Sequence, residues 1–253
     1  MSSRPRAQRA IPASMSALVT GAGRGIGRAA ALALARDGHE VICAARTLAD
    51  LDAVVAEIEA GGGRARAAAL DVTDARALAE LRVDDVEVLV NSAGGNIPEP
   101  FVDVSEGHLD QLIALNVKAT FLVSQRVVRA MCARASGGAI VNVSSQMGRV
   151  GASRRSVYCA TKHAVEGLTK AMAIELAPAS IRVNAVAPTF VETPMTAELL
   201  ADQAFRSWVV ERIPLGELPG VDDVAAAISY LASDAARMIT GASLAVDGGW
   251  TAQ

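Results

Sequence analysis

Tyr158 and Lys162 are the two residues whose types and spacing most directly suggest chemistry. They stand four positions apart in a helical stretch, so their side chains share one face, one turn apart. A phenol has a pKa of about 10 and is a poor base at neutral pH. A nearby ammonium favours the phenolate, and lowering the pKa by about three units corresponds to roughly 4 kcal/mol. The pair is therefore a candidate proton donor and acceptor, although an ordinary surface Tyr–Lys pair has the same spacing.

Ser145 and Asn116 are two further candidates. Ser145 follows the apolar run Ala139–Val143, so it stands where a strand would end and a hydroxyl could hold a substrate oxygen. The alternative is that this serine only caps a turn. Asn116 lies inside a long helical pattern, where asparagine is a poor helix former. Such a residue usually has a polar task, for example bonding to the backbone or to water.

A glycine-rich loop, Thr20-Gly-Ala-Gly-Arg-Gly-Ile-Gly27, directly follows an apolar run and opens a helical stretch. Gly21 permits a tight turn, Gly25 lets a pyrophosphate approach the backbone, and Gly27 allows close packing of helix on strand. Unpaired N–H groups at the helix start favour an anion. The loop predicts a dinucleotide site, with a glycine turn that binds no ligand as the alternative.

The end of the second strand separates the two nicotinamide cofactors. An acid there would bind the ribose 2′-hydroxyl of NAD, whereas an arginine suits the 2′-phosphate of NADP. The strand ends Cys43-Ala-Ala-Arg46, without an acid. Arg46 offers a planar fork for a phosphate, and Arg24 in the glycine loop could assist it. NADP(H) is therefore favoured, and NAD(H) remains possible.

The elements that must position these residues alternate along the chain. Continuous apolar strands separated by helices imply a parallel sheet covered on both faces, and the right-handed crossover rule makes it a doubly wound, Rossmann-like α/β fold. Ligands of such folds bind beyond the carboxyl ends of the strands, so we expect the chemistry just after residues 20, 45, 70, 90, 143 and 186. The predicted strands are Ala17–Thr20, Glu40–Ala45, Arg66–Leu70, Val86–Val90, Ala139–Val143, Arg182–Val186 and Ser243–Val246. The predicted helices are Ile26–Arg36, Leu48–Glu59, about His108 to Ala135, Tyr158–Leu176 and Asp222–Leu231.

The chain shows no internal repeat or linker, so residues 15–253 are predicted to form one domain. Residues 1–14 are basic and contain Pro5 and Pro12; we expect a disordered tail, with a transit peptide as the alternative. The stretch of about 190–215 contains Phe205 and Trp208 and is expected to be a small helical lid over the substrate, unless these rings simply pack. The residues expected to give the pocket its mixed polarity are Gln146, Met147, Arg154 and Phe190.

Composition narrows the classes of function. The 253-residue chain has a formal net charge of −3, which gives no electrostatic reason to expect nucleic acid as a partner. No apolar run approaches the roughly 18 residues of a membrane span. The three cysteines form no paired framework, so a reducing compartment, the cytoplasm, is expected. The three histidines show no metal-ligand spacing, and no metal site is expected.

In this order and spacing the residues resemble the compact, single-domain branch of the short-chain dehydrogenase/reductase family. The resemblance runs from about Met15 to Trp250. The matching stretches are Thr20–Gly27, Asp71-Val72, Asn91–Gly94, Asn116, Ser145, Tyr158-x-x-x-Lys162, Asn184–Pro188 and Asp247-Gly-Gly249.

The resemblance implies reversible hydride transfer between the nicotinamide and a carbonyl or secondary alcohol, and a homotetramer. It implies that Ser145 orients the carbonyl and that Tyr158 transfers the proton. Lys162 would lower the tyrosine pKa and hold the nicotinamide ribose, and Asn116 would support a water-linked proton relay. The remaining residues implied at the cofactor are Ile26, Asp71, Val72, Asn91, Ala93, Gly94, Pro188, Val191 and Thr193, with Val191 and Thr193 at the carboxamide.

The sequence departs from the family pattern at two turns. The usual Asn-Asn-Ala-Gly has Ser92 at its second position. The usual Pro-Gly has Thr189 after Pro188, which removes a residue that tolerates positive φ and puts the local backbone in question. The helix between Asp71 and Val86 is also short.

Two other classes of protein remain as alternatives. A non-catalytic dinucleotide sensor on the same fold should lose the tyrosine or the lysine, and this chain keeps both. A lyase or epimerase on this scaffold usually has a longer chain. The substrate stays open among sugars or polyols, 3-oxoacyl thioesters and small cyclic ketones. The direction is also open, although NADP(H) would favour reduction, the work of a ketoreductase.

Overall fold

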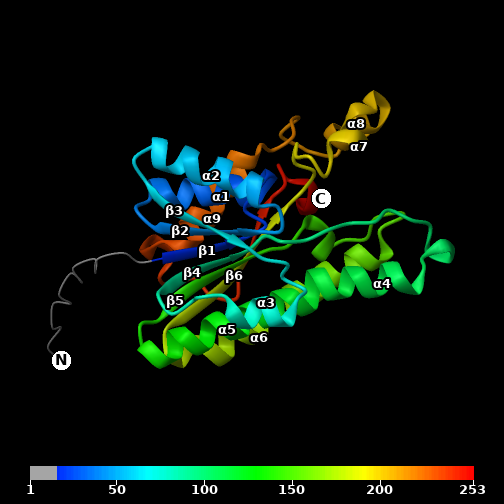
Figure 1. The fold of residues 1–253 in the computed structure, drawn as a ribbon. Coiled ribbons are helices and arrows are strands. Elements are labelled where there is room, and N and C mark those ends of the chain that lie inside the picture. Colours follow the sequence, from blue (N-terminus) through cyan, green and yellow to red (C-terminus); the bar gives the residue numbers. More distant parts are fainter. Residues whose placement is uncertain (1–15) are drawn as a thin grey trace, which may run out of the picture.

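The computed structural model describes residues 16–253, and the tail expected at residues 1–14 lies outside them. Seven strands form one parallel sheet in the order β3-β2-β1-β4-β5-β6-β7 (Figure 1). This doubly wound order confirms the predicted fold class. The strands are β1 (Ser16–Thr20), β2 (Glu40–Ala45), β3 (Arg64–Ala69), β4 (Val86–Asn91), β5 (Gly138–Val143), β6 (Ile181–Pro188) and β7 (Ser243–Val246).

Helices cover both faces of the sheet (Figure 1). One core packs α1, α2 and α9 against the sheet, and a second core packs α3, α5 and α6 against the opposite face. Successive side chains of a strand point to opposite faces, so in β1 Val19 enters the first core and Leu18 the second. These helices are α1 (Gly25–Arg36), α2 (Leu48–Ala60), α3 (Ala75–Glu80), α5 (Ala119–Arg134), α6 (Ser156–Leu176) and α9 (Val221–Ala232).

The strand order reverses between β1 and β4, which are neighbours in the sheet although two strands separate them in sequence. The helices that follow these two strands, α1 and α5, cover opposite faces of the sheet, and in such folds ligands bind at the carboxyl ends of these strands. The predicted candidate residues therefore come to one edge of the sheet. This edge carries the turns after Thr20, Ala45, Ala69, Asn91, Val143 and Pro188.

The long helix predicted from about His108 to Ala135 is interrupted. It consists of α4 (Glu106–Ile113), one π-helical turn, η2 (Ala114–Lys118), and α5. The amide of Ala119 donates to the carbonyl of Ala114, five residues back, which is the bond of a π-helix. Hydrophobic spacing cannot reveal a single wider turn, so the sequence predicted one regular helix.

The segment of about 190–215 is helical as predicted, with α7 (Ala197–Ala201) and α8 (Gln203–Val210). These helices project beyond the sheet near the C-terminus (Figure 1). Four of the eight aromatic residues form one cluster there, with ring centroids 5.5–6.0 Å apart. The cluster comprises Phe190, Phe205, Trp208 and Trp250. The C-terminal 3-10 turn (Trp250–Ala252) thus packs against the predicted lid.

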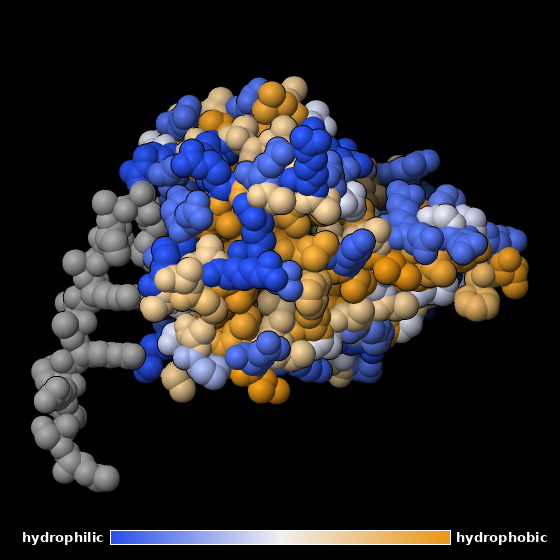
Figure 2. All heavy atoms as spheres, turned by 60° about the horizontal axis from the view of Figure 1, so that its bottom comes forward, coloured by the Kyte–Doolittle hydropathy of each residue, from blue (hydrophilic) through white to orange (hydrophobic). Residues whose placement is uncertain are grey.

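One face of the molecule carries several exposed apolar side chains. Figure 2 brings forward the side of the sheet that α3, α4, α5 and α6 cover. Hydrophobic residues are spread among hydrophilic ones across this face. Phe101 and Val102, in the 3-10 turn before α4, are 81% and 87% exposed. Leu109, Ile113 and Phe121 add further exposed apolar surface on α4 and α5.

Candidate active site

Ser145 and Tyr158 meet where β5 ends and α6 begins. Ser145 precedes the 3-10 turn η3 (Gln146–Gly148), and its Oγ accepts a hydrogen bond of 3.1 Å from the amide of Met147. The same side chain hydrogen-bonds Tyr158 in the first turn of α6. The serine therefore caps a turn, as its alternative interpretation held, and also contacts the tyrosine.

Lys162 is buried one helical turn beyond Tyr158. Its Nζ donates a 2.8 Å hydrogen bond to the carbonyl of Val143 and lies 5.6 Å from the centroid of the Tyr158 ring. Burial lowers the pKa of Lys162 to about 8, although the nearby carboxylate of Glu166 opposes that shift.

The pKa of Tyr158 differs from the sequence expectation. Burial raises it to about 12, although the hydrogen bond with Ser145 lowers it. We expected the ammonium, together with the positive charge of an oxidised nicotinamide, to lower this pKa; in the protein alone, loss of hydration is the larger effect and the pKa is raised. At neutral pH the phenol is therefore protonated and ready to donate.

Asn116 lies in the π-helical turn η2, and its side chain is fully engaged. Its Oδ1 accepts from the amide of Gly95, while its Nδ2 donates to the carbonyl of Gly95, each at 2.9 Å. Nδ2 also donates to Thr161 Oγ1 at 3.1 Å. A Cβ on Gly94 would lie 3.2 Å from Asn116 Oδ1 and 3.8 Å from Lys162 Nζ. The asparagine thus fixes the turn after β4 beside Lys162 without bonding to the lysine directly.

A buried polar network beneath the site was not predicted from the sequence. Asn91 ends β4, and its Nδ2 donates to Ser124 Oγ at 2.9 Å and to Asn142 Oδ1 at 2.8 Å. Asn142, its register partner on β5, donates in turn to Thr169 Oγ1 at 2.9 Å. Burying these groups is tolerable because each finds a partner. The sequence feature that could have indicated this network was Asn142, an asparagine inside the otherwise apolar strand Ala139–Val143.

The glycine loop has the geometry that its sequence required. Gly21 and Gly25 adopt φ values of 69° and 56°, which other residues rarely adopt. A Cβ on Gly27 would run into the carbonyl of Gly21. Arg24 is the N-cap of α1 and makes no side-chain capping bond, so the first amides of that helix keep their capacity to bind an anion.

Thr20 joins the glycine loop to the turn after β4. Its Oγ1 accepts hydrogen bonds from the amides of Ser92 and Ala93, at 3.1 and 3.2 Å. A Cβ on Gly21 would lie 2.9 Å from the amide nitrogen of Ala93. The serine at position 92 leaves this turn intact, since its backbone makes the contact. Thr20 was not singled out as a site residue from the sequence.

Arg46 and Asp71 lie close together beyond β2 and β3, which pair through Ala45 and Ala69. Hydrogen bonds from Thr73 lower the pKa of Asp71, and the charge of Arg46 adds to that effect. Arg46 itself is exposed, and Val72 is buried. An arginine and not an acid thus marks the end of β2.

The turn after β6 brings Thr193 to the glycine loop. A Cβ on Gly25 would lie 3.3 Å from Thr193 Cγ2. Thr189 has no positive φ, so the doubt about its backbone was unfounded; its amide donates to Val246 at 3.2 Å. Pro188 and Val191 are buried on either side.

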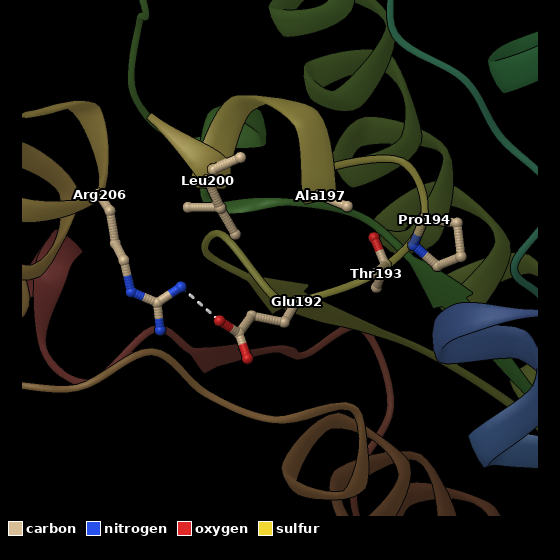
Figure 3. Close-up of a pocket in the computed structure, with 7 residues that line it drawn as sticks. Glu192, Thr193, Pro194, Ala197, Leu200 and Arg206 are labelled. Atoms are coloured by element: carbon tan, nitrogen blue, oxygen red, sulfur yellow. Dashed lines mark hydrogen bonds and ion pairs between the residues drawn. The ribbon is translucent and has the colours of Figure 1, made fainter. Parts of the chain in front are cut away.

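A hollow of about 390 Å³ lies between this turn and the lid helices (Figure 3). Its walls include Glu192, Thr193, Pro194, Ala197, Leu200, Ala201 and Arg206. Figure 3 shows the ion pair between Arg206 on α8 and Glu192 on the turn. This pair connects the lid to the segment that carries Thr193.

Comparisons with known proteins agree with this geometry. The family described as "Enoyl-(Acyl carrier protein) reductase" matches residues 21–251. The chain is 42% identical to L-xylulose reductase of Bos taurus over 95% of its own length and 98% of that protein. The chain belongs to the short-chain dehydrogenase/reductase family. It is an oxidoreductase that acts on a CH–OH or C=O group.

Solved members of the short-chain dehydrogenase/reductase family share the whole fold. A protein of Agrobacterium tumefaciens, solved with bound NADP, is 40% identical with a TM-score of 0.91, over 96% of this chain and all of that one. A gluconate 5-dehydrogenase of Burkholderia cenocepacia, in complex with NADP and tartrate, is 32% identical with a TM-score of 0.88, over 94% and 97% of the two chains. These relatives support a catalytic role and give no support to the non-catalytic sensor.

The site of this family member fits a nicotinamide dinucleotide. The glycine loop and the uncapped N-terminal amides of α1 suit the pyrophosphate of such a cofactor. Buried side-chain atoms that lack a hydrogen-bond partner also gather after β4, β5 and β6. They are Asn96 Oδ1, Ser144 Oγ, Gln146 Oε1 and Thr189 Oγ1. Such atoms are costly to bury, which is consistent with partners supplied by a polar ligand.

Two findings concern other kinds of site. Within residues 16–253, no group of His, Cys, Asp and Glu side chains is arranged to hold a metal ion. None of the helices in that range is long and apolar enough to cross a membrane.

Proposed function

We propose that this enzyme uses NADPH to reduce a polyhydroxylated ketone to a secondary alcohol. The observation that carries the proposal is the contact between Ser145 and Tyr158 beside the buried Lys162, at the carboxyl edge of the sheet. When bound, the cofactor supplies the hydride. The chain's own residues orient the carbonyl and supply the proton.

Ser145 and Tyr158 act on the substrate oxygen. The serine hydroxyl orients the carbonyl, and the tyrosine hydroxyl donates its proton to the oxygen as negative charge develops there. The raised pKa of Tyr158 keeps it protonated before the reaction. In the oxidative direction the same oxygen takes the proton back.

Lys162 and Asn116 support that proton transfer. The ammonium of Lys162 stabilises the phenolate that the reaction leaves on Tyr158 and holds the nicotinamide ribose. Asn116 positions the Gly94–Gly95 turn and α6 through its bonds to Gly95 and Thr161. The side-chain amide of Asn116 makes no bond to Lys162. Its contribution to a water-linked proton path is therefore indirect: it holds in place the segments that surround the lysine.

The bound cofactor would extend from the glycine loop to Tyr158. Arg46, with Arg24, would bind the 2′-phosphate and give NADP(H) its advantage over NAD(H). Asp71 and Val72 would flank the adenine, and Val191 and Thr193 would meet the carboxamide. The other residues assigned to the cofactor are Gly21, Gly25, Ile26, Gly27, Asn91, Ala93, Gly94, Tyr158, Lys162 and Pro188.

A hydroxyl-rich substrate is favoured over an acyl thioester or a cyclic ketone. The relatives named above include an L-xylulose reductase and a gluconate 5-dehydrogenase. The unpaired buried atoms of Ser144, Gln146 and Thr189 could bond several substrate hydroxyls. The lid formed by α7 and α8 would exclude water once the substrate is bound.

The direct test is NADPH oxidation, followed at 340 nm, with L-xylulose, acetoacetyl thioester and cyclohexanone as substrates. We expect turnover of L-xylulose above the other two. Tyr158→Phe removes only the hydroxyl and should abolish turnover while NADPH fluorescence still reports binding. Preference for the thioester or the cyclic ketone would overturn the substrate class. Full activity of Tyr158→Phe would overturn the mechanism.

We also propose a homotetramer. Members of the family usually form one, and the exposed apolar residues of α4 and α5 offer a surface for subunit contact. Light scattering after gel filtration should give about four times the 26.0 kDa chain mass. Phe121→Glu, in the exposed apolar surface of α5, should shift the enzyme to smaller species. A wild-type monomer would contradict the assembly.

A cytoplasmic location is proposed from the three free cysteines, Cys43, Cys132 and Cys159. Cell fractionation with a reducing-compartment marker tests it. Recovery in a secreted or membrane fraction would overturn it.

A further inference from the structure

Arg155 is a buried cation that has no acidic partner. The residue is only 7% exposed, and no ion pair within residues 16–253 includes it. Residues 1–15 contain no Asp or Glu that could supply one. Its guanidinium makes one hydrogen bond, from Nη1 to the carbonyl of Arg154 at 3.2 Å, and its Nε has no partner. A buried, unpaired charge is among the most costly features that a fold can contain.

The surroundings of Arg155 add to that cost. It is the N-cap of the 21-residue helix α6, where the helix dipole favours negative charge and disfavours a cation. The adjacent Arg154 brings a second positive charge. Arg154 has a φ of 60°, and its carbonyl also accepts from the amide of Glu99. The backbone there is thus held in a strained conformation while Arg155 stays buried.

The position of Arg155 relative to the chemistry is defined by the helix. Tyr158 and Lys162 share one face of α6, and Arg155 is the N-cap residue three positions before Tyr158. The positive charge of Arg155 acts on the ionisation of Tyr158 and lowers its pKa slightly, against the larger effect of burial. The residue with the unpaired donor therefore lies about one helical turn from the residue that transfers the proton.

We propose that Arg155 binds a carboxylate of the substrate, so that the enzyme acts on keto acids of the sugar series in preference to neutral ketoses. This inference rests on the proposed function of the site. A guanidinium presents its donors in a fork that matches a carboxylate. A carboxylate bound there would pair the buried charge, use the free Nε–H, and complement the start of α6. It would also fix the distance between the charged end of the substrate and the carbonyl held at Tyr158.

The experiment compares two six-carbon substrates that differ in charge. NADPH oxidation is measured at pH 7 with 5-keto-D-gluconate, which carries a carboxylate, and with D-fructose, which does not. We expect the wild-type enzyme to prefer the keto acid. Arg155→Gln should lower kcat/KM for the keto acid by about 100-fold, mostly through KM, and change that for D-fructose less than about threefold. Arg155→Lys should restore part of the loss.

Arg237→Gln is the control. It removes the same charge from an exposed arginine outside the site, and we expect kcat/KM for either substrate to change less than about threefold. Thermal unfolding gives a second measurement. Tartrate should raise the melting temperature of the wild type and of Arg237→Gln but not of Arg155→Gln, and neutral erythritol should leave all three unchanged.

Three results would contradict the proposal. They are a wild-type preference for D-fructose, an equal loss for both substrates in Arg155→Gln, and a tartrate effect that survives in Arg155→Gln. Each of these would leave the proposed oxidoreductase activity standing. If the wild type binds NADPH but reduces neither these substrates nor L-xylulose, the proposed function itself fails.

Discussion

The ammonium of Lys162 lies 2.8 Å from the main-chain carbonyl oxygen of Val143, the last residue of β5. This bond ties the catalytic helix α6 to the carboxyl edge of the sheet. It also holds the charge 5.6 Å from the centroid of the Tyr158 ring. The strand end and the helix face that the sequence predicted separately are thus joined by one hydrogen bond.

The pH dependence of carbonyl reduction should report Lys162. Its pKa is about 8, so raising the pH through this value removes the charge that stabilises the Tyr158 phenolate. We expect kcat/KM to fall with a midpoint near that pH. Lys162→Arg stays charged, so its rate should be lower but flat across the same range. A wild-type profile without this fall, or the same fall in Lys162→Arg, would refute the assignment.

Lys162 should make the free energy of unfolding rise with pH between about 8 and 10.5. The pKa of Lys162 is lowered from 10.5 to about 8, so the unfolded chain binds more protons between these values and the free energy of unfolding increases across them. Tyr158, with a pKa raised from 10.0 to about 12, acts in the opposite sense between its own two values. Lys162→Met should therefore flatten the rise in urea unfolding experiments. Lys170→Met, at an exposed position on the same helix, should not.

Gly27→Ala should weaken both the fold and nucleotide binding. Its Cβ would meet the carbonyl of Gly21, so the glycine loop must shift, at a cost of about 1–3 kcal/mol. The control is Gly167→Ala in α6, where a Cβ meets no atom within 4 Å. That change should be neutral or stabilise the helix by up to about 1 kcal/mol. Equal unfolding energies for the two variants would show that the loop does not need its close contact.

Arg46→Ala should change the choice of cofactor. Fluorescence titration should show NADPH binding weakened by about 10- to 100-fold, whereas NADH binding changes less than about twofold. Arg64→Ala, an exposed arginine at the start of β3, is the control and should affect neither. A wild-type preference for NADH would reverse our interpretation of this strand end while leaving the enzyme class intact.

Trp250→Ala should loosen the lid. The centroid of its ring lies 5.9 Å from that of Trp208 on α8 and 6.0 Å from that of Phe190, so its loss removes the aromatic contacts between the C-terminus and the lid. We expect KM for the substrate to rise about tenfold with little change in NADPH affinity. Trp250→Phe keeps an aromatic ring and should recover most of the effect. An unchanged KM would mean that the cluster serves packing alone.

Local patterns determined much of this enzyme. The glycine spacing, the four-residue separation of Tyr158 and Lys162, and the positions of the strand ends are properties of short segments. Backbone sterics and the periods of helix and strand act within a few residues, so these features can be recognised directly from the sequence. The doubly wound class of the parallel sheet followed as well, because right-handed crossovers leave few arrangements.

Only the tertiary structure determined the hydrogen-bond partners, the burial and the pKa values of these residues. The π-helical turn at Asn116, the network of Asn91, Asn142 and Thr169, and the packing of Trp250 on the lid join segments far apart in the chain. Burial likewise depends on every neighbouring element, so the raised pKa of Tyr158 could not be obtained from its spacing to a lysine. For the same reason the sequence could not show that, of two neighbouring arginines, the fold exposes Arg154 and buries Arg155. Loss of hydration is set by the assembled protein and not by any one segment.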